Sequence, residues 1–322
     1  MSQTKALLDF FERQMDSWPE AAERYDALAH IKERVLNTGK STNLIELSAE
    51  DHELPVRLQF NPARAVSTAA KVDKAAIAAR PCFLCKDNRP ASQIIYTGFE
   101  GYDTLVNPFP IFPKHFTIAC KEHRHQDTAD FREMARIAKE LPGMTVFYNG
   151  SQAGASAPDH LHFQAGNKDF LPVCSLLEKA PGSLMYATSQ FKAYYPDTLP
   201  ISAVHFISEE VDSEMLIWIN TLLPTDDETL LPNAGMRNLL MWVDDNAALH
   251  TLFMPRAKHR PECYYAEDGF MVSPGAVDMA GVIILPRHAD FEKISMNDIR
   301  HIYDEVSFEY RDTERFQRLM LR

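Results

Sequence analysis

The chain has 322 residues, of which 45% are hydrophobic, and its formal net charge is −12. This length and apolar content predict a globular protein with a full core. The excess of negative charge argues against nucleic acid and anionic membranes as partners, because both require clustered positive charge. Charged residues interrupt the N-terminal apolar positions, and the sequence has no apolar run long enough to cross a bilayer. We therefore expect a cytoplasmic protein with no membrane association.

The N-terminal segment, residues 1–54, is predicted to be helical. Its periodic stretch, residues 5–36, is interrupted at Ser17-Trp18-Pro19-Glu20, where Ser17 and Glu20 have capping-box spacing and Pro19 suits a first helical turn. This pattern predicts a helical hairpin packed on the core. An alternating strand is then expected over residues 56–60.

The middle of the chain has a strand and helix order typical of an α+β fold. Residues 104–110 and 114–123 are interpreted as two strands joined by a proline-rich turn. A helix capped by Asp127 or Thr128 should follow, and then a strand over residues 144–148. A glycine-containing loop and a last strand complete an antiparallel sheet with flanking helices.

The second half contains a weak echo of the first. Residues 250–260 resemble residues 115–124, which makes an internal duplication plausible. With a junction near residues 194–197, we predict a catalytic half over residues 55–196 and a second, non-catalytic half over residues 197–322. The second half has no His-x-His motif, so the chemistry is expected in the first.

Three polar residues, His160, His162 and Gln164, are predicted to lie on one face of the last strand of the first half. Leu161 and Phe163 alternate with them and should face the core. Because an inner strand face is usually apolar, this pattern indicates a ligand, a metal or a reaction.

A metal site is predicted from Cys82 and Cys85, which are separated by two residues. The chain has five cysteines, an odd number that argues against a disulfide framework in a reducing compartment. Zinc requires two further ligands, and His160 together with His123 or His125 is available. The expected cofactor is therefore Zn²⁺, and the choice between His123 and His125 stays open.

His162 is then free to react. A neutral imidazole attacks activated phosphorus and forms a covalent phosphoramidate. The preceding loop, residues 149–156, provides backbone N–H groups and short side chains that suit phosphate oxygens. Gln164 cannot donate a proton to a poor leaving group, so the leaving group should be stable as an anion, as a phosphate is. This reasoning favours transfer between phosphates over hydrolysis.

The stretch Gly154-Ala155-Ser156-Ala157-Pro158-Asp159-His160-Leu161-His162-Phe163-Gln164 resembles the signature of the transferase branch of the histidine-triad superfamily. That branch includes galactose-1-phosphate uridylyltransferase, diadenosine tetraphosphate phosphorylase and GDP-hexose phosphorylase, and the His-Leu-His-Phe-Gln wording is most similar to the last. Residues 59–64 and 272–281 are also similar to this phosphorylase.

The resemblance implies a duplicated histidine-triad fold and a role for each matching residue. His162 would be the nucleophile that becomes nucleotidylated, and Gln164 would hold the phosphoryl group. Cys82, Cys85, His123 and His160 would bind zinc. The remaining residues expected to contact substrate are Arg64, Asn149, Ser151, Gln152 and Ser156.

We therefore expect a nucleotidyltransferase or phosphorylase, monomeric or homodimeric. Its substrate would be a nucleotide-sugar or a dinucleoside polyphosphate, and its acceptor phosphate or a sugar phosphate. The alternatives are a histidine-triad nucleotide hydrolase and an inactive nucleotide-binding zinc protein. The base, the sugar and the acceptor are left open.

Overall fold

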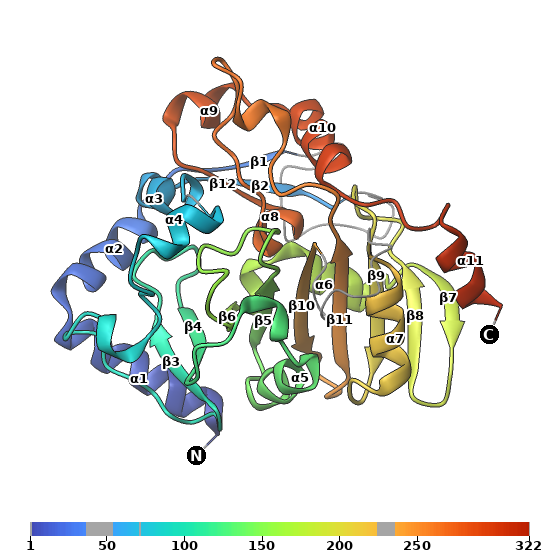
Figure 1. Cartoon of the computed structure of the whole chain (residues 1–322), viewed down its shortest axis with the longest axis horizontal. Helices are drawn as coiled ribbons and strands as arrows, with labels where there is room; N and C mark the ends of the chain where they lie inside the picture. Colours follow the sequence, from blue (N-terminus) through green and yellow to red (C-terminus); the bar gives the residue numbers. More distant parts are fainter. Residues whose placement is uncertain (1, 37–53, 71, 224–235, 322) are drawn as a thin grey trace.

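The computed structural model describes residues 2–36, 54–70, 72–223 and 236–321. Within these ranges the centre of the molecule is a nine-stranded antiparallel sheet of order β3-β4-β6-β5-β10-β11-β9-β8-β7 (Figure 1). A second sheet of order β1-β2-β12 pairs β2 and β12 in parallel. The strands are β1 (Glu33–Leu36), β2 (Val56–Phe60), β3 (Tyr102–Val106), β4 (His115–Cys120), β5 (Met144–Asn149), β6 (His162–Asn167), β7 (Ser183–Ala187), β8 (Phe191–Tyr195), β9 (Val204–Ser208), β10 (Arg237–Val243), β11 (Leu249–Pro255) and β12 (Val282–Leu285).

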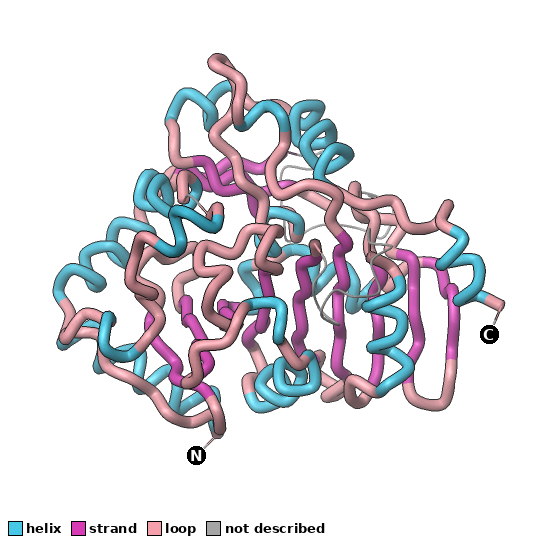
Figure 2. Tube along the Cα trace, in the orientation of Figure 1, coloured by secondary structure: helices cyan, strands magenta, loops and turns pink. Residues whose placement is uncertain are grey.

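Helices cover both faces of the large sheet (Figure 2). They are α1 (Gln3–Ser17), α2 (Pro19–Ala29), α3 (Ala65–Thr68), α4 (Lys74–Ala78), α5 (Phe131–Glu140), α6 (Pro172–Lys179), α7 (Ser213–Thr221), α8 (Ala276–Met279), α9 (His288–Lys293), α10 (Met296–Val306) and α11 (Glu314–Met320). In the described part of the chain, no helix combines the length and the apolar character needed to cross a membrane.

The core has two main layers, one on each face of the large sheet. Apolar residues of α1, α5 and α7 pack on one face, together with Leu161 and Phe163. Apolar residues of β2, β12, α6 and α10 pack on the other face. Because strand side chains alternate, His162 and Gln164 face the second layer. His162 and Gln164 therefore face the layer that contains the small sheet.

The large sheet consists of two units with the same topology. The first is β3-β4-α5-β5-β6, and the second is β8-β9-α7-β10-β11; each places its four strands in the spatial order first, second, fourth, third. The units meet at β5 and β10, which pair antiparallel. The expected α+β class and the duplication of the fold are confirmed.

Strand registers show which residues correspond between the two units. In the first unit Asp103, Ala119 and His162 lie in one row across the sheet. In the second unit the row is Lys192, Ile207 and His250. Asp103 and Lys192 are each the second residue of their strand, and Ala119 and Ile207 are each the last but one. His250 therefore corresponds to His162.

The sequence similarity between residues 250–260 and residues 115–124 does not join corresponding strands of the two units. Residues 250–260 begin in β11, which corresponds to β6, whereas residues 115–120 form β4. The two stretches share a strand-to-loop pattern of similar residues, and such a pattern fits any strand that leaves the same edge of a sheet. The repeat begins at β8, and the division of the chain at residues 196 and 197 stays a prediction.

The N-terminal prediction was right for the hairpin of α1 and α2 and wrong at its end. Residues 33–36 form β1, which pairs with β2, because tertiary pairing overrides the local helical pattern. Trp18 is the N-cap of α2 and makes no side-chain cap bond, so Ser17 does not form the expected capping box. Residues 37–53 of this segment lie outside the described residues.

Two expected helix caps had different outcomes. Helix α5 begins after Asp130, whose carboxylate accepts from the Arg132 amide, and not after Asp127 or Thr128. Those two residues belong to a single 3-10 turn at Gln126–Thr128. The Ser295 cap of α10 is present as expected.

Candidate active site and metal centre

His162 is the first residue of β6 and is 4% exposed. Its Nδ1 lies 2.8 Å from the backbone oxygen of His160. A carbonyl oxygen only accepts, so Nδ1 carries the proton and Nε2 keeps a lone pair. Burial lowers the pKa of His162 to about 4, with the His160 carbonyl opposing this shift. The imidazole is thus neutral at pH 7, which is the form that acts as a nucleophile.

The side chain of Gln126 holds His162 in place. Its Oε1 accepts from the amide of His162 at 3.0 Å. Its Nε2 donates to the backbone oxygens of His162 at 3.0 Å and Asn149 at 2.8 Å. Gln126 is fully buried, so these bonds satisfy polar groups that have no access to water. One side chain thereby holds together the last residue of β5, Asn149, and the first residue of β6, His162.

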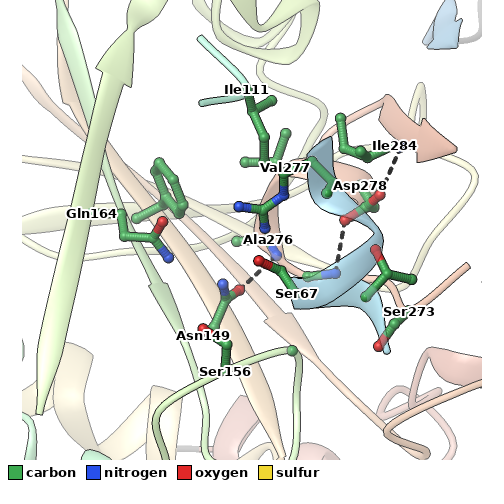
Figure 3. A pocket seen from close by; sticks show the side chains of 15 residues that line it. Ser67, Ile111, Asn149, Ser156, Gln164, Ser273, Ala276, Val277, Asp278 and Ile284 are labelled. Carbon is green, nitrogen blue, oxygen red and sulfur yellow. Dashed lines mark hydrogen bonds between the residues drawn. The ribbon is translucent and has the colours of Figure 1, made fainter. Parts of the chain in front are cut away.

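A polar pocket of about 50 Å³ lies on the same face of the sheet; Gln164, two residues after His162, lines it, whereas His162 itself is not among its lining residues. Figure 3 shows Gln164 of β6 and Asn149 of β5 on one side of it, with Ser67 and Ala276 opposite. Ser156 and Arg64 also line the pocket. The volume exceeds what one water needs.

Part of the opposite wall of the pocket comes from the second half of the chain. Ser273, Gly275 and Asp278 line it, and the backbone N–H of Ala276 donates to Asn149 Oδ1 at 2.7 Å. Gly154 has a φ of +94°, and a Cβ there would lie 2.7 Å from the Gly275 Cα. Glycine at position 154 is therefore needed both for its backbone conformation and for the contact between the two halves.

The pocket is lined by one half-buried cation, Arg64, and one buried acid, Asp278. Burial lowers the pKa of Arg64 to about 10, and nearby Asp278 opposes this effect. Burial raises the pKa of Asp278 to about 6, although its carboxylate accepts from the amides of Gly275 and Ile284. Arg64 therefore stays charged at pH 7 and provides positive charge where a phosphate would bind.

The four predicted metal ligands lie together: the side-chain donor atoms of Cys82, Cys85, His123 and His160 are all within 4.8 Å of one another. His160 Nδ1 lies 3.3 Å from Cys82 Sγ, and His123 Nδ1 lies 3.1 Å from Cys85 Sγ. A tetrahedral zinc ion with Zn–S and Zn–N bonds of about 2.3 and 2.0 Å separates its ligand atoms by a few ångströms. The cluster has the size and donor set of such a site.

The orientation of His160 also suits a metal. Its Nε2 lies 2.7 Å from the backbone oxygen of Cys120, so Nε2 carries the proton and Nδ1 presents its lone pair to the cysteines. His125 lies elsewhere: its Nδ1 accepts from the amide of Asp127. Of the two candidate histidines, the structure places His123 with the cysteines.

Two predicted substrate contacts do not line the pocket. The hydroxyl of Ser151 donates to Asp127 Oδ2 at 2.6 Å, which turns the side chain away. Gln152 is exposed. The sequence analysis also missed residues that do line the pocket, among them Ser67, Ser273, Gly275 and Asp278. The similarity of residues 272–281 to the GDP-hexose phosphorylase could have indicated Ser273, Gly275 and Asp278 as residues of the site.

Comparisons with known proteins agree with this architecture. A family model described as a domain of unknown function (DUF4922) matches residues 10–167. No curated protein matches the chain. The crystal structure of yeast Ap4A phosphorylase Apa2 in complex with AMP is similar, with a TM-score of 0.56 and 16% identity over 92% of this chain and 96% of that chain. The same enzyme in complex with Ap4A gives a TM-score of 0.50 and 14% identity over 90% and 96% of the two chains.

The chain shares the fold of this phosphorylase. At such identities the likeness concerns the fold, and it extends over nearly the whole of both chains. The α+β fold expected from the sequence is therefore one that this enzyme shares.

Proposed function

We propose that the protein is a nucleotidyltransferase of the phosphorylase type that works by double displacement through His162. The observation that carries the proposal is the position of His162. Its neutral imidazole is held through Nδ1 by the His160 carbonyl, and two residues further along the strand Gln164 lines a polar pocket that contains Arg64. A nucleophile next to a site for anionic oxygens is what phosphoryl transfer requires.

In the first step, the Nε2 lone pair of His162 attacks the α-phosphorus of the substrate. The N–P bond forms as the bond to the bridging oxygen breaks, and that oxygen leaves with its electron pair as part of a phosphate-terminated product. In the second step an oxygen of the acceptor phosphate attacks the same phosphorus, and the lone pair returns to Nε2. The two steps consume no net proton, which fits the lack of a general acid at Gln164.

The shared fold makes a dinucleoside polyphosphate the first substrate to test, and nucleotide-sugars come next. Arg64, Asn149, Ser156 and Gln164 would contact phosphate oxygens. We also propose that Cys82, Cys85, His123 and His160 hold zinc. When bound, the ion would supply a structural cross-link between the loop at residues 82–85 and the start of β6.

The test is covalent labelling. The protein is mixed with Ap4A, UDP-glucose and GDP-mannose, each labelled at the α-phosphorus, and protein-bound label is measured after denaturation. We expect label on the wild type and on His250→Ala, the matched variant in the second unit, and none on His162→Ala. Equal labelling of His162→Ala would overturn the assignment of the nucleophile.

The rival function is hydrolysis, in which water replaces the phosphate acceptor. Turnover of the labelled substrate with and without inorganic phosphate separates the two. We expect turnover that depends on phosphate and a nucleoside diphosphate as product. A rate that is independent of phosphate, with release of a nucleoside monophosphate, supports the hydrolase instead.

A further inference from the structure

The side-chain amide of Gln164 has its two ends in different surroundings. Its Oε1 lies 3.0 Å from His115 Nε2 and 3.4 Å from Asn107 Nδ2. Gln164 lines the pocket, and with Oε1 held by these two donors the amide nitrogen is the end left to face it. The chemical character of the pocket therefore depends on what fixes this orientation, because a rotated amide would present an acceptor in place of a donor.

The proton on His115 is placed by a backbone group. The N–H of Ile111 points to His115 Nδ1 at 3.1 Å, and a backbone N–H only donates. Nδ1 must therefore hold a lone pair, and the proton of the neutral ring is on Nε2. His115 is 0% exposed, and burial together with the charge of Arg64 lowers its pKa to about 3. The ring is thus a fixed donor to Gln164 Oε1.

Asn107 is oriented in the same way. Its Oδ1 accepts from the backbone N–H of Phe109 at 2.9 Å, so its Nδ2 is directed at Gln164 Oε1 and at Thr117 Oγ1. Two donors, each set by a different backbone N–H, converge on one oxygen. Rotation of the Gln164 amide would bring its own N–H groups against both donors, which costs the buried polar groups their partners.

We propose that His115 and Asn107 are positioning residues that lock Gln164 as a hydrogen-bond donor to the transferred phosphoryl group. The inference rests on the proposed transfer through His162 and deepens it. The locked donor matches a fully deprotonated phosphoryl oxygen, which has lone pairs and no proton. Neither residue contacts the reacting atoms, and each acts through Gln164.

Asn149 is locked by an independent relay from the second half. Arg256 only donates, and its Nη1 lies 2.6 Å from Asn238 Oδ1. Asn238 Nδ2 therefore donates to Asn149 Oδ1 at 2.9 Å, where the amide of Ala276 also donates. The nitrogen of Asn149 is left to the pocket. Both amides that line the pocket thus present donors.

One experiment tests the tautomer without any activity. The protein is labelled with ¹⁵N-histidine, and the signals of His115 are assigned by their loss in His115→Gln. We expect the neutral Nε2–H tautomer throughout the range from about pH 6 to pH 8. The Nδ1–H tautomer, or titration to the imidazolium in this range, overturns the inference. This result is independent of whether any substrate labels His162.

A second experiment uses the substrate that labels the wild type and measures the rate of labelling. His115→Leu removes the donor, and we expect a loss of about 10- to 100-fold, as for other supporting groups of a reactive site. His115→Gln keeps an N–H near the position of Nε2 and should recover most of the rate. Asn107→Ala is the second variant, in case His115→Leu does not fold.

The decisive control is the Gln164→Ala background. If His115 and Asn107 act through Gln164, their substitution adds little loss once Gln164 is absent. An equal loss in both backgrounds means that the two residues have a structural role only, and it overturns the inference. If the wild type is not labelled by any probe, the proposed function fails, while the NMR experiment still decides the tautomer.

Discussion

The indole of Trp242 stacks on the imidazole of His250, with ring centres 5.1 Å apart and planes at 21°. His250 occupies the register position of His162, and Leu252 and Leu240 correspond to Gln164 and Phe147. Two residues beyond Leu240, Trp242 therefore occupies the position of Asn149. The second unit therefore has a histidine at the position of His162 and an aromatic ring at the position of Asn149, a residue that lines the pocket of the first unit.

This relationship predicts different outcomes for the two histidines. His250→Ala should leave labelling by nucleotide unchanged and lower the free energy of unfolding by about 2 kcal/mol, since it removes a buried, stacked and hydrogen-bonded ring. His162→Ala should abolish labelling. Labelling rates and urea unfolding of both variants check this. Loss of labelling in a stably folded His250→Ala would show that the second unit takes part in the chemistry.

Removal of a cysteine from the metal cluster should remove the metal. We expect stoichiometric zinc in the wild type, and little in Cys82→Ser and Cys85→Ser, because a serine hydroxyl is a poor zinc ligand. If the wild-type site is saturated about a hundredfold above its dissociation constant, losing zinc costs about 2.7 kcal/mol. Metal analysis and thermal unfolding measure both effects.

The matched control for the metal is Cys174→Ser. Cys174 is buried next to Thr145 and lies outside the cluster, so this variant tests the loss of a buried thiol alone. It should keep its zinc. Unchanged zinc content in the Cys82 and Cys85 variants would contradict the assignment of the ligands.

Gln126 should be important for stability as well as for geometry. Gln126→Met keeps the size of the side chain and leaves the backbone groups of His162 and Asn149 without their partners. Each unpaired buried group costs about 1–3 kcal/mol, so we expect a loss of at least about 2 kcal/mol in urea unfolding. The exposed Gln190→Met is the control and should unfold like the wild type. Similar stability of the two variants would contradict this role.

Stability should fall as the solution becomes acidic, and His205 should account for part of the fall. Burial and then the neighbouring His250 lower the pKa of His205 to about 3, while the Pro181 carbonyl accepts from Nδ1 and opposes the shift. Asp244 lies 3.6 Å from His250 Nε2 on the far side of that ring. His205 also lies 6.1 Å from the ring of Tyr194.

The sign follows from comparing the folded and unfolded states. The folded pKa of His205 is below the unfolded value of about 6.5, so its contribution is fully present above pH 6.5 and is lost as the pH falls toward 3. Over this window, one such histidine lowers the free energy of unfolding by about 1.4 kcal/mol for each unit by which the pH falls. Between pH 6.5 and 5, the free energy of unfolding measured in urea should fall by about 2 kcal/mol less in His205→Gln than in the wild type. In the control His301→Gln, which replaces an exposed histidine, it should fall as in the wild type. An unchanged slope in His205→Gln would contradict the prediction.

The sequence by itself identified the strand of the candidate nucleophile and the four residues of the candidate metal cluster. Alternation within His162-Phe163-Gln164 places the two polar residues on one face, because a strand has a period of two residues. His160, which was expected on the same strand, lies just before β6. Paired cysteines and a histidine pattern are local signals for a metal site, and the structure brings all four of those side chains together.

Only the tertiary structure decided what surrounds that strand. The wall formed by Ser273 to Asp278, the relay from Arg256 to Asn149, and the locking of Gln164 by His115 join residues far apart in the chain. None of these contacts has a local period or spacing. The orientation of an amide depends on which donors surround it, and that is known only when the strands and loops that carry those donors are placed.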